Sequence, residues 1–323
     1  MPGRILIGTC SWADRSLIDC GRFYPKKTMS SRDRLAFYAG QFPFVEIDSS
    51  YYAIPQLPHV QAWVETVPSG FVFDMKAYGM LTQHLVQPQT LPPSVRSLMP
   101  RGLMHRDRIP YAAAPAEVVD AVWAEFKAAA APIAAAGKLG VLVFQFPPRF
   151  EAGDDHRAYL ERLAERAAPY RVAVEFRNHS WLADPAAQRE TFALLKAGGL
   201  CYVAVDEPQG FESSIPPVLE PTGPVAVIRL HGRNRATWER SGPTASDRFD
   251  YTYRTDELAE WVPRVRALVE AGIEVHLSVN TNKDDQGPAN ARLLMTLLPE
   301  SVTVAPPPDA ATTPTPGQLP LFG

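Results

Sequence analysis

Cysteine is scarce in this sequence of 323 residues, which has only Cys10, Cys20 and Cys201. An odd, widely spaced set excludes a disulfide framework or a cysteine-based zinc site, and it is typical of reduced thiols. Long apolar runs are absent too, since none approaches the roughly 18 residues that a membrane-spanning helix needs. A β-rich run begins almost at once, at residues 5–7, and leaves no room for a secretion signal. We therefore expect a cytoplasmic protein with no membrane partner.

Neither sign of charge dominates, because the formal net charge is only −3. A global attraction to nucleic acid or to an anionic membrane is therefore not expected, and any polyanion site must be a local basic patch. Apolar residues make up 46% of the chain and charged residues 21%, so the chain can bury a full core. Its length suits one large α/β barrel or two ordinary domains.

Eight short β-rich runs recur along the chain, separated by segments long enough for helices. They begin near residues 4, 44, 71, 140, 171, 200, 224 and 273. Strands that alternate with helices indicate a parallel sheet. No glycine fingerprint of a dinucleotide-binding sheet is present, so we predict a single-domain α/β fold, a (β/α)₈ barrel of the TIM type; an open doubly wound sheet is the alternative. The clearest helices are expected at 115–136, 155–168, 184–198, 255–271 and 288–298, with Pro132 kinking or ending the first.

Two long segments, 80–114 and 232–254, interrupt this alternation, and both are rich in arginine. Loops of such length inside a compact domain are usually functional or mobile. Residues 1–304 are predicted to form the barrel domain. Residues 305–323 are rich in proline, threonine and alanine, and are predicted to form a flexible tail.

Polar side chains gather at the C-terminal ends of the strand runs. Because side chains alternate along a strand, Glu175 and Arg229 take the face opposite their apolar neighbours. The same alternation assigns to this face Glu46, Asp48, Asp74, Lys76, Gln145, Arg177, Asp206, His231, His276, Ser278 and Asn280. The outside of a barrel is covered by helices and must be apolar, so we expect this set to point inward, at the mouth where such barrels carry their sites. The alternative is an inert salt-bridge network that plugs the barrel.

Several motifs in series resemble the YecE-like family, also called domain of unknown function 72. They are IGTCSW at 7–12, VEIDSSYY at 45–52, FQFPP at 144–148, AVEFRNHSW at 173–181, RLHG at 229–232, and VNTN followed by GPANA at 279–291. The resemblance spans about residues 5–298. It implies a TIM-type barrel, related in shape to metal-dependent endonucleases and sugar isomerases, but no particular reaction. It maps the family's recurring positions onto Glu46, Lys76, Gln145, Glu175, Arg177, His179, Trp181, Arg229, His231, Asn280 and Asn282.

These residue types suit an anionic substrate. We expect Glu175 to act as base or metal ligand and His231 to carry protons, with Glu46 and Asp206 completing the catalytic set. The residues expected to bind substrate are Lys76, Gln145, Arg177, His179, Trp181, Arg229, Asn280 and Asn282. A divalent metal held by the carboxylates and histidines of this set stays open. Without an H-x-H or H-E-x-x-H spacing, however, a metal-free site held by arginine–glutamate pairs is favoured.

The end of the chain resembles the short Q-L-x-L-F motif by which bacterial polymerases and repair proteins dock on the replication sliding clamp. Gln318, Leu319, Leu321 and Phe322 match it, behind a proline-rich linker that could extend roughly 40 Å. The resemblance implies the sliding clamp as a partner and shifts the expected function towards DNA metabolism. The alternative is a tail that folds back onto its own barrel.

Three functions stay open. The first is an enzyme acting on nucleic acid or nucleotides in DNA repair, such as a phosphodiesterase (a hydrolase), recruited by the clamp. The second is an isomerase or lyase acting on a small anionic, sugar-like molecule. The third is a non-catalytic module that grips a DNA lesion. The sequence cannot separate the first from the third, because both need the same grip on phosphate.

Overall fold

The structure, a computed structural model, describes residues 3–239, 245–298 and 304. Its eight strands pair in parallel in chain order, and β8 closes onto β1, so the predicted barrel is confirmed. The strands are β1 (Ile5–Thr9), β2 (Phe44–Ile47), β3 (Val72–Lys76), β4 (Leu139–Gln145), β5 (Val172–Glu175), β6 (Cys201–Asp206), β7 (Val225–Leu230) and β8 (Glu274–Val279). Each lies at one of the predicted runs.

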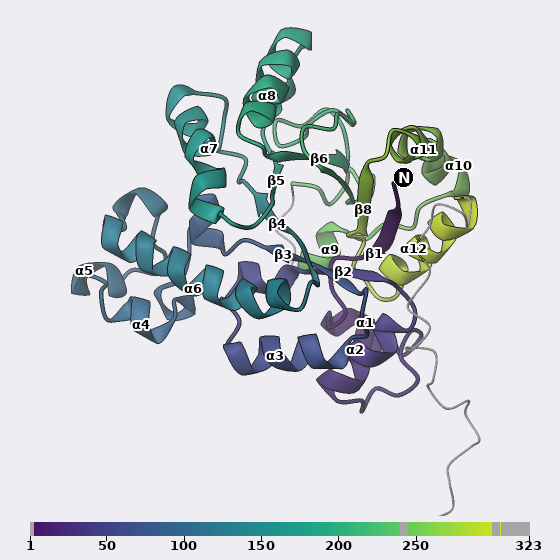
Figure 1. Cartoon of the computed structure of the whole chain (residues 1–323), viewed down its shortest axis with the longest axis horizontal. Coiled ribbons are helices and arrows are strands. Elements are labelled where there is room, and N and C mark those ends of the chain that lie inside the picture. Colours follow the sequence, from purple (N-terminus) through teal and green to yellow (C-terminus); the bar gives the residue numbers. More distant parts are fainter. Residues whose placement is uncertain (1–2, 240–244, 299–303, 305–323) are drawn as a thin grey trace, which may run out of the picture.

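Helices surround the barrel (Figure 1). The α-helices are α1 (Arg15–Cys20), α2 (Ser31–Ala39), α3 (Leu57–Thr66), α4 (Pro93–Arg96), α5 (Arg101–Met104), α6 (Ala116–Ala135), α7 (Asp154–Ala167), α8 (Pro185–Ala197), α9 (Ala245–Arg248), α10 (Thr255–Ala259), α11 (Val262–Glu270) and α12 (Gln286–Leu297). Short 3-10 segments are η1 (Asp48–Tyr51), η2 (Gly79–Thr82), η3 (Pro88–Thr90), η4 (Tyr111–Ala113) and η5 (His179–Leu182). Within the described ranges, no helix combines the length and apolarity needed to cross a membrane.

One helix prediction is wrong in detail. The helix expected at 255–271 is divided into α10 and α11, and between them the indole N–H of Trp261 donates to the Asp206 carboxylate at 2.8 Å. Pro263 falls in the first turn of α11, where a missing N–H is harmless. The helix predicted at 115–136 is confirmed as α6, which runs through Pro132 to Ala135, so Pro132 does not end it; the lost hydrogen bond falls in the last turns of a well-buried helix.

The segment 80–114 is folded against the barrel rather than being a bare loop. It contains α4, α5 and three 3-10 segments, and Val86 and Ile109 form an antiparallel bridge across it. Leu81, Val95 and Ile109 are fully buried. The segment is therefore part of the hydrophobic core, which the high content of proline and arginine concealed.

Strand register decides which side chains point into the barrel, because paired residues of neighbouring strands share a face. Val205 pairs with Arg229, and Asp206 pairs with Leu230. Arg229 reaches across the interior to Glu46, so Asp206 must face the helices. The prediction that Asp206 points into the mouth is therefore wrong. Strand β6 is buried on both faces, so the pattern of its apolar residues does not show which side chains point into the barrel. The acid that points inward is the next residue, Glu207.

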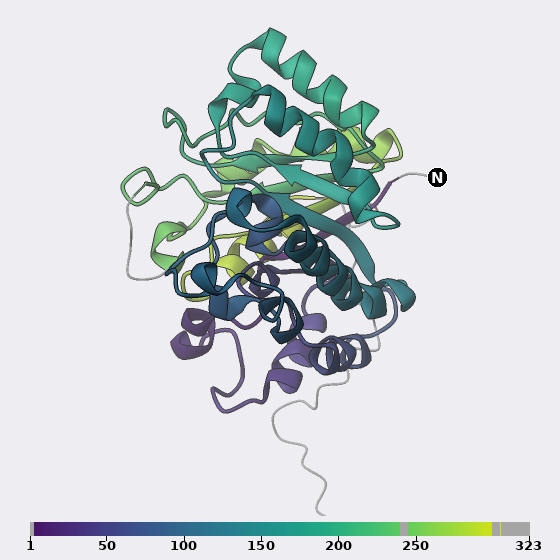
Figure 2. The ribbon, with the colours of Figure 1, turned by 90° about the vertical axis from the view of Figure 1, so that its left-hand side faces the viewer.

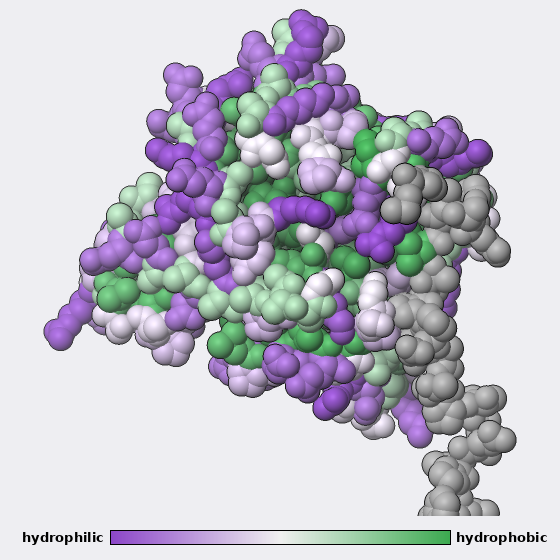
Figure 3. All heavy atoms as spheres, in the orientation of Figure 1, coloured by the Kyte–Doolittle hydropathy of each residue, from purple (hydrophilic) through white to green (hydrophobic). Residues whose placement is uncertain are grey.

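The N-terminal end of the barrel is closed by apolar side chains. Leu6, Phe44 and Val72 form a buried cluster, and Val304 packs against it while its N–H donates to the Ile5 carbonyl at 2.9 Å. Figure 2 shows this end beside the chain's N-terminus, with the segment after β7 at the opposite end. Figure 3 looks onto it and shows hydrophobic residues around the middle of the face.

A buried ionic group lies next to this apolar cluster. The Nδ1 atom of His276 lies 3.0 Å from both carboxylate oxygens of Asp74, and its Nε2 lies 3.0 Å from Oε1 of Glu274. Since each ring nitrogen faces an acceptor, both carry protons. Burial alone would lower the pKa of His276, but the two carboxylates raise it to about 9. His276 is therefore a buried cation that holds this end of the barrel together.

Candidate functional site

Arg229 occupies the centre of the barrel near its C-terminal end and is fully buried. Its Nε and Nη2 donate to the two carboxylate oxygens of Glu46 at 2.9 and 2.7 Å. Its Nη1 donates to Oε2 of Glu175 and, at 3.1 Å, to Oε1 of Gln145. The structure thus brings these four predicted residues together around one guanidinium.

Arg177 forms a second centre just above Glu175. Its Nε donates to Oε1 of Glu175, and its Nη1 donates to Oε2 of Glu207 at 3.0 Å. Glu207 also accepts a hydrogen bond from the backbone N–H of Ile215 at 2.8 Å. The sequence reasoning missed Glu207, although it follows β6 directly. No signal in the sequence could have found it, because both faces of β6 are buried and only the pairing of Val205 with Arg229 shows which acid points inward.

His231 is buried between Arg177 and Asn280. Its Nε2 lies 2.8 Å from Nη2 of Arg177, and its Nδ1 lies 2.9 Å from the Asn280 carboxamide. The same Nε2 also lies 3.2 Å from Oε1 of Glu175, so it faces both a donor and an acceptor. The Asn280 atom that faces Nδ1 is the amide nitrogen Nδ2, which can only donate. Burial and then Arg177 hold the pKa of His231 well below its usual range, so the ring is neutral at physiological pH.

The carboxyl groups of this network differ in their pKa values and therefore in whether they are ionised near neutral pH. Burial raises the pKa of Glu46 to about 7 and that of Glu207 to about 8, in spite of their arginine partners. Burial also opposes ionisation of Glu175, yet Arg177 and Arg229 together hold its pKa well below its usual range. Glu175 is therefore ionised throughout the neutral range, while Glu46 and Glu207 are the groups that can hold a proton there.

Lys76 lies beside this network. Its Nζ donates to Oδ1 of Asp48 at 2.7 Å and lies 4.8 Å from the ring centre of Tyr51. Cys10, the residue after β1, contacts the network, because its Sγ lies 3.5 Å from Nη2 of Arg229. Burial raises the pKa of its thiol, which stays protonated. Cys10, Cys20 and Cys201 are all free thiols.

Three other predicted residues lie outside this network. His179 is exposed at the start of η5. Trp181 is fully buried, stacked near Phe150 and Phe176, and its indole N–H donates to the Phe150 carbonyl at 2.7 Å. Asn282 is half-buried after β8, and its carboxamide oxygen has no hydrogen-bond partner among the described residues. Trp181 is thus a core residue with no free face for a ligand.

Within the described ranges, no three or more histidine, cysteine, aspartate and glutamate side chains are grouped so that they could hold a metal ion. Two members of the set considered for a metal lie apart from the others. Asp206 faces the helices, where Arg233 and Trp261 bind its carboxylate, and His179 is exposed. Glu46 and Glu175 remain close, but both are bound to Arg229.

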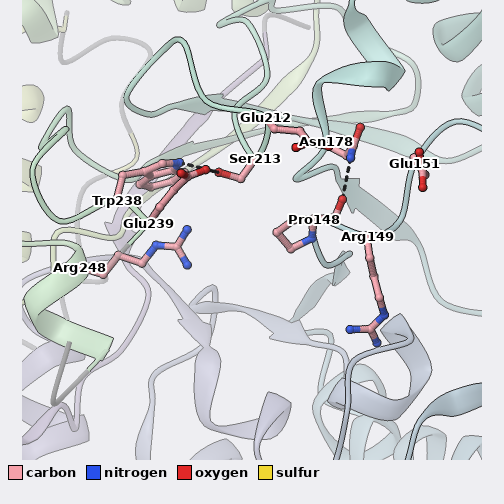
Figure 4. A pocket seen from close by; sticks show the side chains of 9 residues that line it. All are labelled: Pro148, Arg149, Glu151, Asn178, Glu212, Ser213, Trp238, Glu239 and Arg248. Atoms are coloured by element: carbon pink, nitrogen blue, oxygen red, sulfur yellow. Dashed lines mark hydrogen bonds between the residues drawn. The ribbon is translucent and has the colours of Figure 1, made fainter. Parts of the chain in front are cut away.

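A pocket of about 670 Å³ lies in the loops at the C-terminal ends of β4 to β7 (Figure 4). It is lined by Pro148, Arg149, Glu151, Asn178, Glu212, Ser213, Trp238, Glu239 and Arg248. Trp238 forms the boundary between the pocket and the buried network, because its ring centre lies 5.1 Å from the guanidinium carbon of Arg177 and 6.3 Å from the His231 ring. None of the lining residues is among the predicted site residues, because side-chain alternation gives no signal in loops. Trp238, Glu239 and Arg248 do lie in the segment 232–254, whose length marked it as functional or mobile.

Comparison with known proteins settles the family. The family model described as "Protein of unknown function DUF72" matches residues 6–315. This chain belongs to the DUF72 family. It is 32% identical over 298 residues to UPF0759 protein YunF of Bacillus subtilis, covering 91% of this chain and 94% of that protein.

Solved structures of the same family share the fold. A DUF72 protein from Enterococcus faecalis is 26% identical with a TM-score of 0.70, covering 91% of this chain and 94% of that one. One from Thermotoga maritima is 25% identical with a TM-score of 0.70, covering 91% and 98%. The resemblance to the YecE-like family is therefore confirmed along nearly the whole chain, and the family's printed description assigns no reaction.

Proposed function

We propose that this DUF72 barrel is an enzyme acting on a small hydroxylated molecule, such as a sugar derivative, in the pocket at its mouth. The observation that carries the proposal is the pocket itself, because its size and its position at the strand ends are those of small-molecule sites in such barrels. In this proposal the protein works in the cytoplasm, where its free thiols stay reduced.

The lining supports a sugar-like ligand better than nucleic acid. Glu151, Glu212 and Glu239 outnumber Arg149 and Arg248, so a polyanion would meet as much repulsion as attraction. Carboxylates accept hydrogen bonds from hydroxyl groups, as sugar binding requires. Among the described residues of the lining, Trp238 is the only aromatic one, and it is 1% exposed. A base would therefore find no open ring to stack on, which weighs against both the nuclease and the lesion-binding hypotheses.

The reaction class that we propose is proton transfer, as in an isomerase or lyase. Glu212 and Glu239 are exposed carboxylates on the pocket wall and can reach a bound ligand. Glu46, Glu175 and His231, the catalytic candidates from the sequence, lie in the buried network below. We propose that Glu175 and His231 fix Arg177, and through it Trp238, at the floor of the pocket, while Glu46 holds Arg229, which binds Glu175.

Proton NMR in deuterated water tests this function. Aldoses, ketoses, sugar acids and sugar phosphates are incubated with the protein, and loss of a C–H signal next to a carbonyl reports proton exchange. With a compound that exchanges, Glu239→Gln should slow exchange about 100-fold, the size of a general acid–base contribution. Glu161→Gln, an exposed change on α7, is the matched control. Absence of exchange across the panel, together with cleavage of an oligonucleotide, would instead support the nuclease hypothesis.

The terminal motif supports a separate proposal, that the protein docks on the sliding clamp through Gln318, Leu319, Leu321 and Phe322. These residues lie outside the described residues, so this proposal rests on the sequence alone. Clamp docking would place the enzyme near replicating DNA without requiring DNA as its substrate.

A further inference from the structure

Arg248 is the cation that points into the mouth pocket. Its guanidinium extends from the end of α9 towards the middle of the pocket, whereas Arg149 turns away to donate to the Gln83 carbonyl (Figure 4). The Nε of Arg248 is buried and has no hydrogen-bond partner among the described residues. In the part of the chain that the structure describes, no carboxylate lies within ion-pair distance of this guanidinium. Glu207, Glu239 and Glu175 act on Arg248 only from beyond that distance, so its guanidinium lacks a direct ion-pair partner among the described residues.

Aromatic rings, rather than an ion pair, hold Arg248 in place. Its guanidinium carbon lies 4.6 Å from the ring centre of Trp238 and 5.9 Å from that of Phe249. The indole N–H of Trp238 donates to the Ser213 hydroxyl at 3.1 Å, and that hydroxyl donates to Glu239 at 3.0 Å. The wall that carries Arg248 is thus fixed by hydrogen bonds. Cation–π contact positions the guanidinium but leaves its N–H groups free for a ligand.

The guanidinium stays charged in these surroundings. Burial, followed by repulsion from Arg177, lowers the pKa of Arg248 to about 10, which is still well above neutral pH. A partly buried cation without a counter-ion is costly, and an anionic ligand would supply the missing partner through charge-assisted hydrogen bonds. The site is therefore prepared for an anion before any ligand arrives.

We infer that Arg248 binds a carboxylate of the ligand, which makes the preferred substrates of this pocket sugar acids rather than neutral or phosphorylated sugars. The inference rests on the proposed function and names its substrate class. The planar guanidinium matches the two oxygens of a carboxylate. Glu212 and Glu239 share the lining with Arg248. A doubly charged phosphate would double its attraction to Arg248 but also its repulsion from these carboxylates, which outnumber the one guanidinium that points into the pocket, so the net balance favours a singly charged group.

Arginine side-chain NMR on the full chain tests this site without a known substrate. The Nε–H signal of Arg248, assigned by its loss in Arg248→Gln, is followed during titration with acetate, with inorganic phosphate above its second pKa, and with glycerol. We expect a saturable shift with acetate, a weaker one with phosphate and none with glycerol. Arg149→Gln, which changes the other arginine of the lining, should leave the acetate titration unchanged.

Two outcomes would overturn the inference. Tighter binding of phosphate than of acetate would exclude the carboxylate, and the absence of any saturable, anion-specific shift would exclude Arg248 as an anion site. Neither outcome depends on turnover. Failure of the proposed enzyme function would show separately, as absent deuterium exchange with an intact acetate site.

Discussion

Arg229 on β7 holds Glu46 on β2 through two parallel hydrogen bonds, at 2.9 and 2.7 Å, although β8 and β1 lie between these strands in the barrel. The pair therefore spans the interior and joins opposite parts of the wall. Both side chains are fully buried, so their mutual bonds replace the water that they lost on folding.

Replacing Arg229 by methionine should destabilise the protein strongly. Glu46 and Glu175 would each lose a buried positive partner, and breaking a buried ion pair from one side typically costs about 3–5 kcal/mol. Urea denaturation of Arg229→Met measures the loss of unfolding free energy. Arg15→Met removes a guanidinium whose side chain is 94% exposed and should change stability by less than about 0.5 kcal/mol. A similar small effect for both variants would show that the network contributes little.

The charge of His276 predicts a loss of stability at alkaline pH. Its pKa is raised from 6.5 to about 9 in the folded protein, so the folded state binds more protons than the unfolded state between these values. This contribution is fully present below pH 6.5 and is lost as pH rises through about 9. Unfolding free energy measured across this range should fall with pH in the wild type and fall less in His276→Gln. His59→Gln, at an exposed histidine, should keep the wild-type slope.

Gly140 on β4 provides the space for this ionic group. A Cβ atom at position 140 would lie 2.3 Å from Oδ1 of Asp74 and 2.6 Å from Cε1 of His276. Asp74 cannot move freely, because its Oδ1 also accepts the N–H of Val141 at 2.9 Å. Gly140→Ala should therefore cost about 1–3 kcal/mol, as overpacking does.

Thermal and urea unfolding of Gly140→Ala against Gly102→Ala tests this prediction. A Cβ at Gly102, in α5, would meet nothing within 4 Å, so that change should be neutral or slightly stabilising. Equal stability of the two variants would contradict the close packing around Asp74.

The terminal motif predicts binding of the isolated tail to a bacterial sliding clamp. A labelled peptide spanning 305–323 should bind with micromolar affinity in a fluorescence anisotropy titration. The double change Gln318→Ala and Phe322→Ala should weaken binding at least about 10-fold, because such anchor residues carry most of the energy in small interfaces. Equal binding of both peptides would remove the main reason to connect this protein with DNA.

The sequence predicted the barrel well because its signals are local. Each strand is a short apolar run, and polar residues mark the strand ends, so both the strand count and the inward position of Glu46, Glu175 and Arg229 could be derived. The alternation of polar and apolar side chains did not identify the inward residues of β6, because both faces of this strand are buried and Asp206 and Glu207 are both acids. There, only the pairing of Val205 with Arg229 decides which acid points inward.

The pocket could not be predicted in the same way. Trp238, Glu239 and Arg248 come from a long segment whose path depends on contacts with distant residues, such as the bond from Trp238 to Ser213. Likewise, the sequence predicted that Trp181 binds substrate, whereas packing against Phe150 and Phe176 makes it a core residue. Loop geometry is set by tertiary contacts that no spacing of residues reveals.

Val304 shows at which end of the barrel the last residues of the chain begin. It packs against Leu6, Phe44 and Val72 at the N-terminal end, so the terminal residues 305–323 follow from the pole opposite the mouth. In the proposed function, a partner that binds the last residues is therefore attached to the chain at the end of the barrel opposite the pocket.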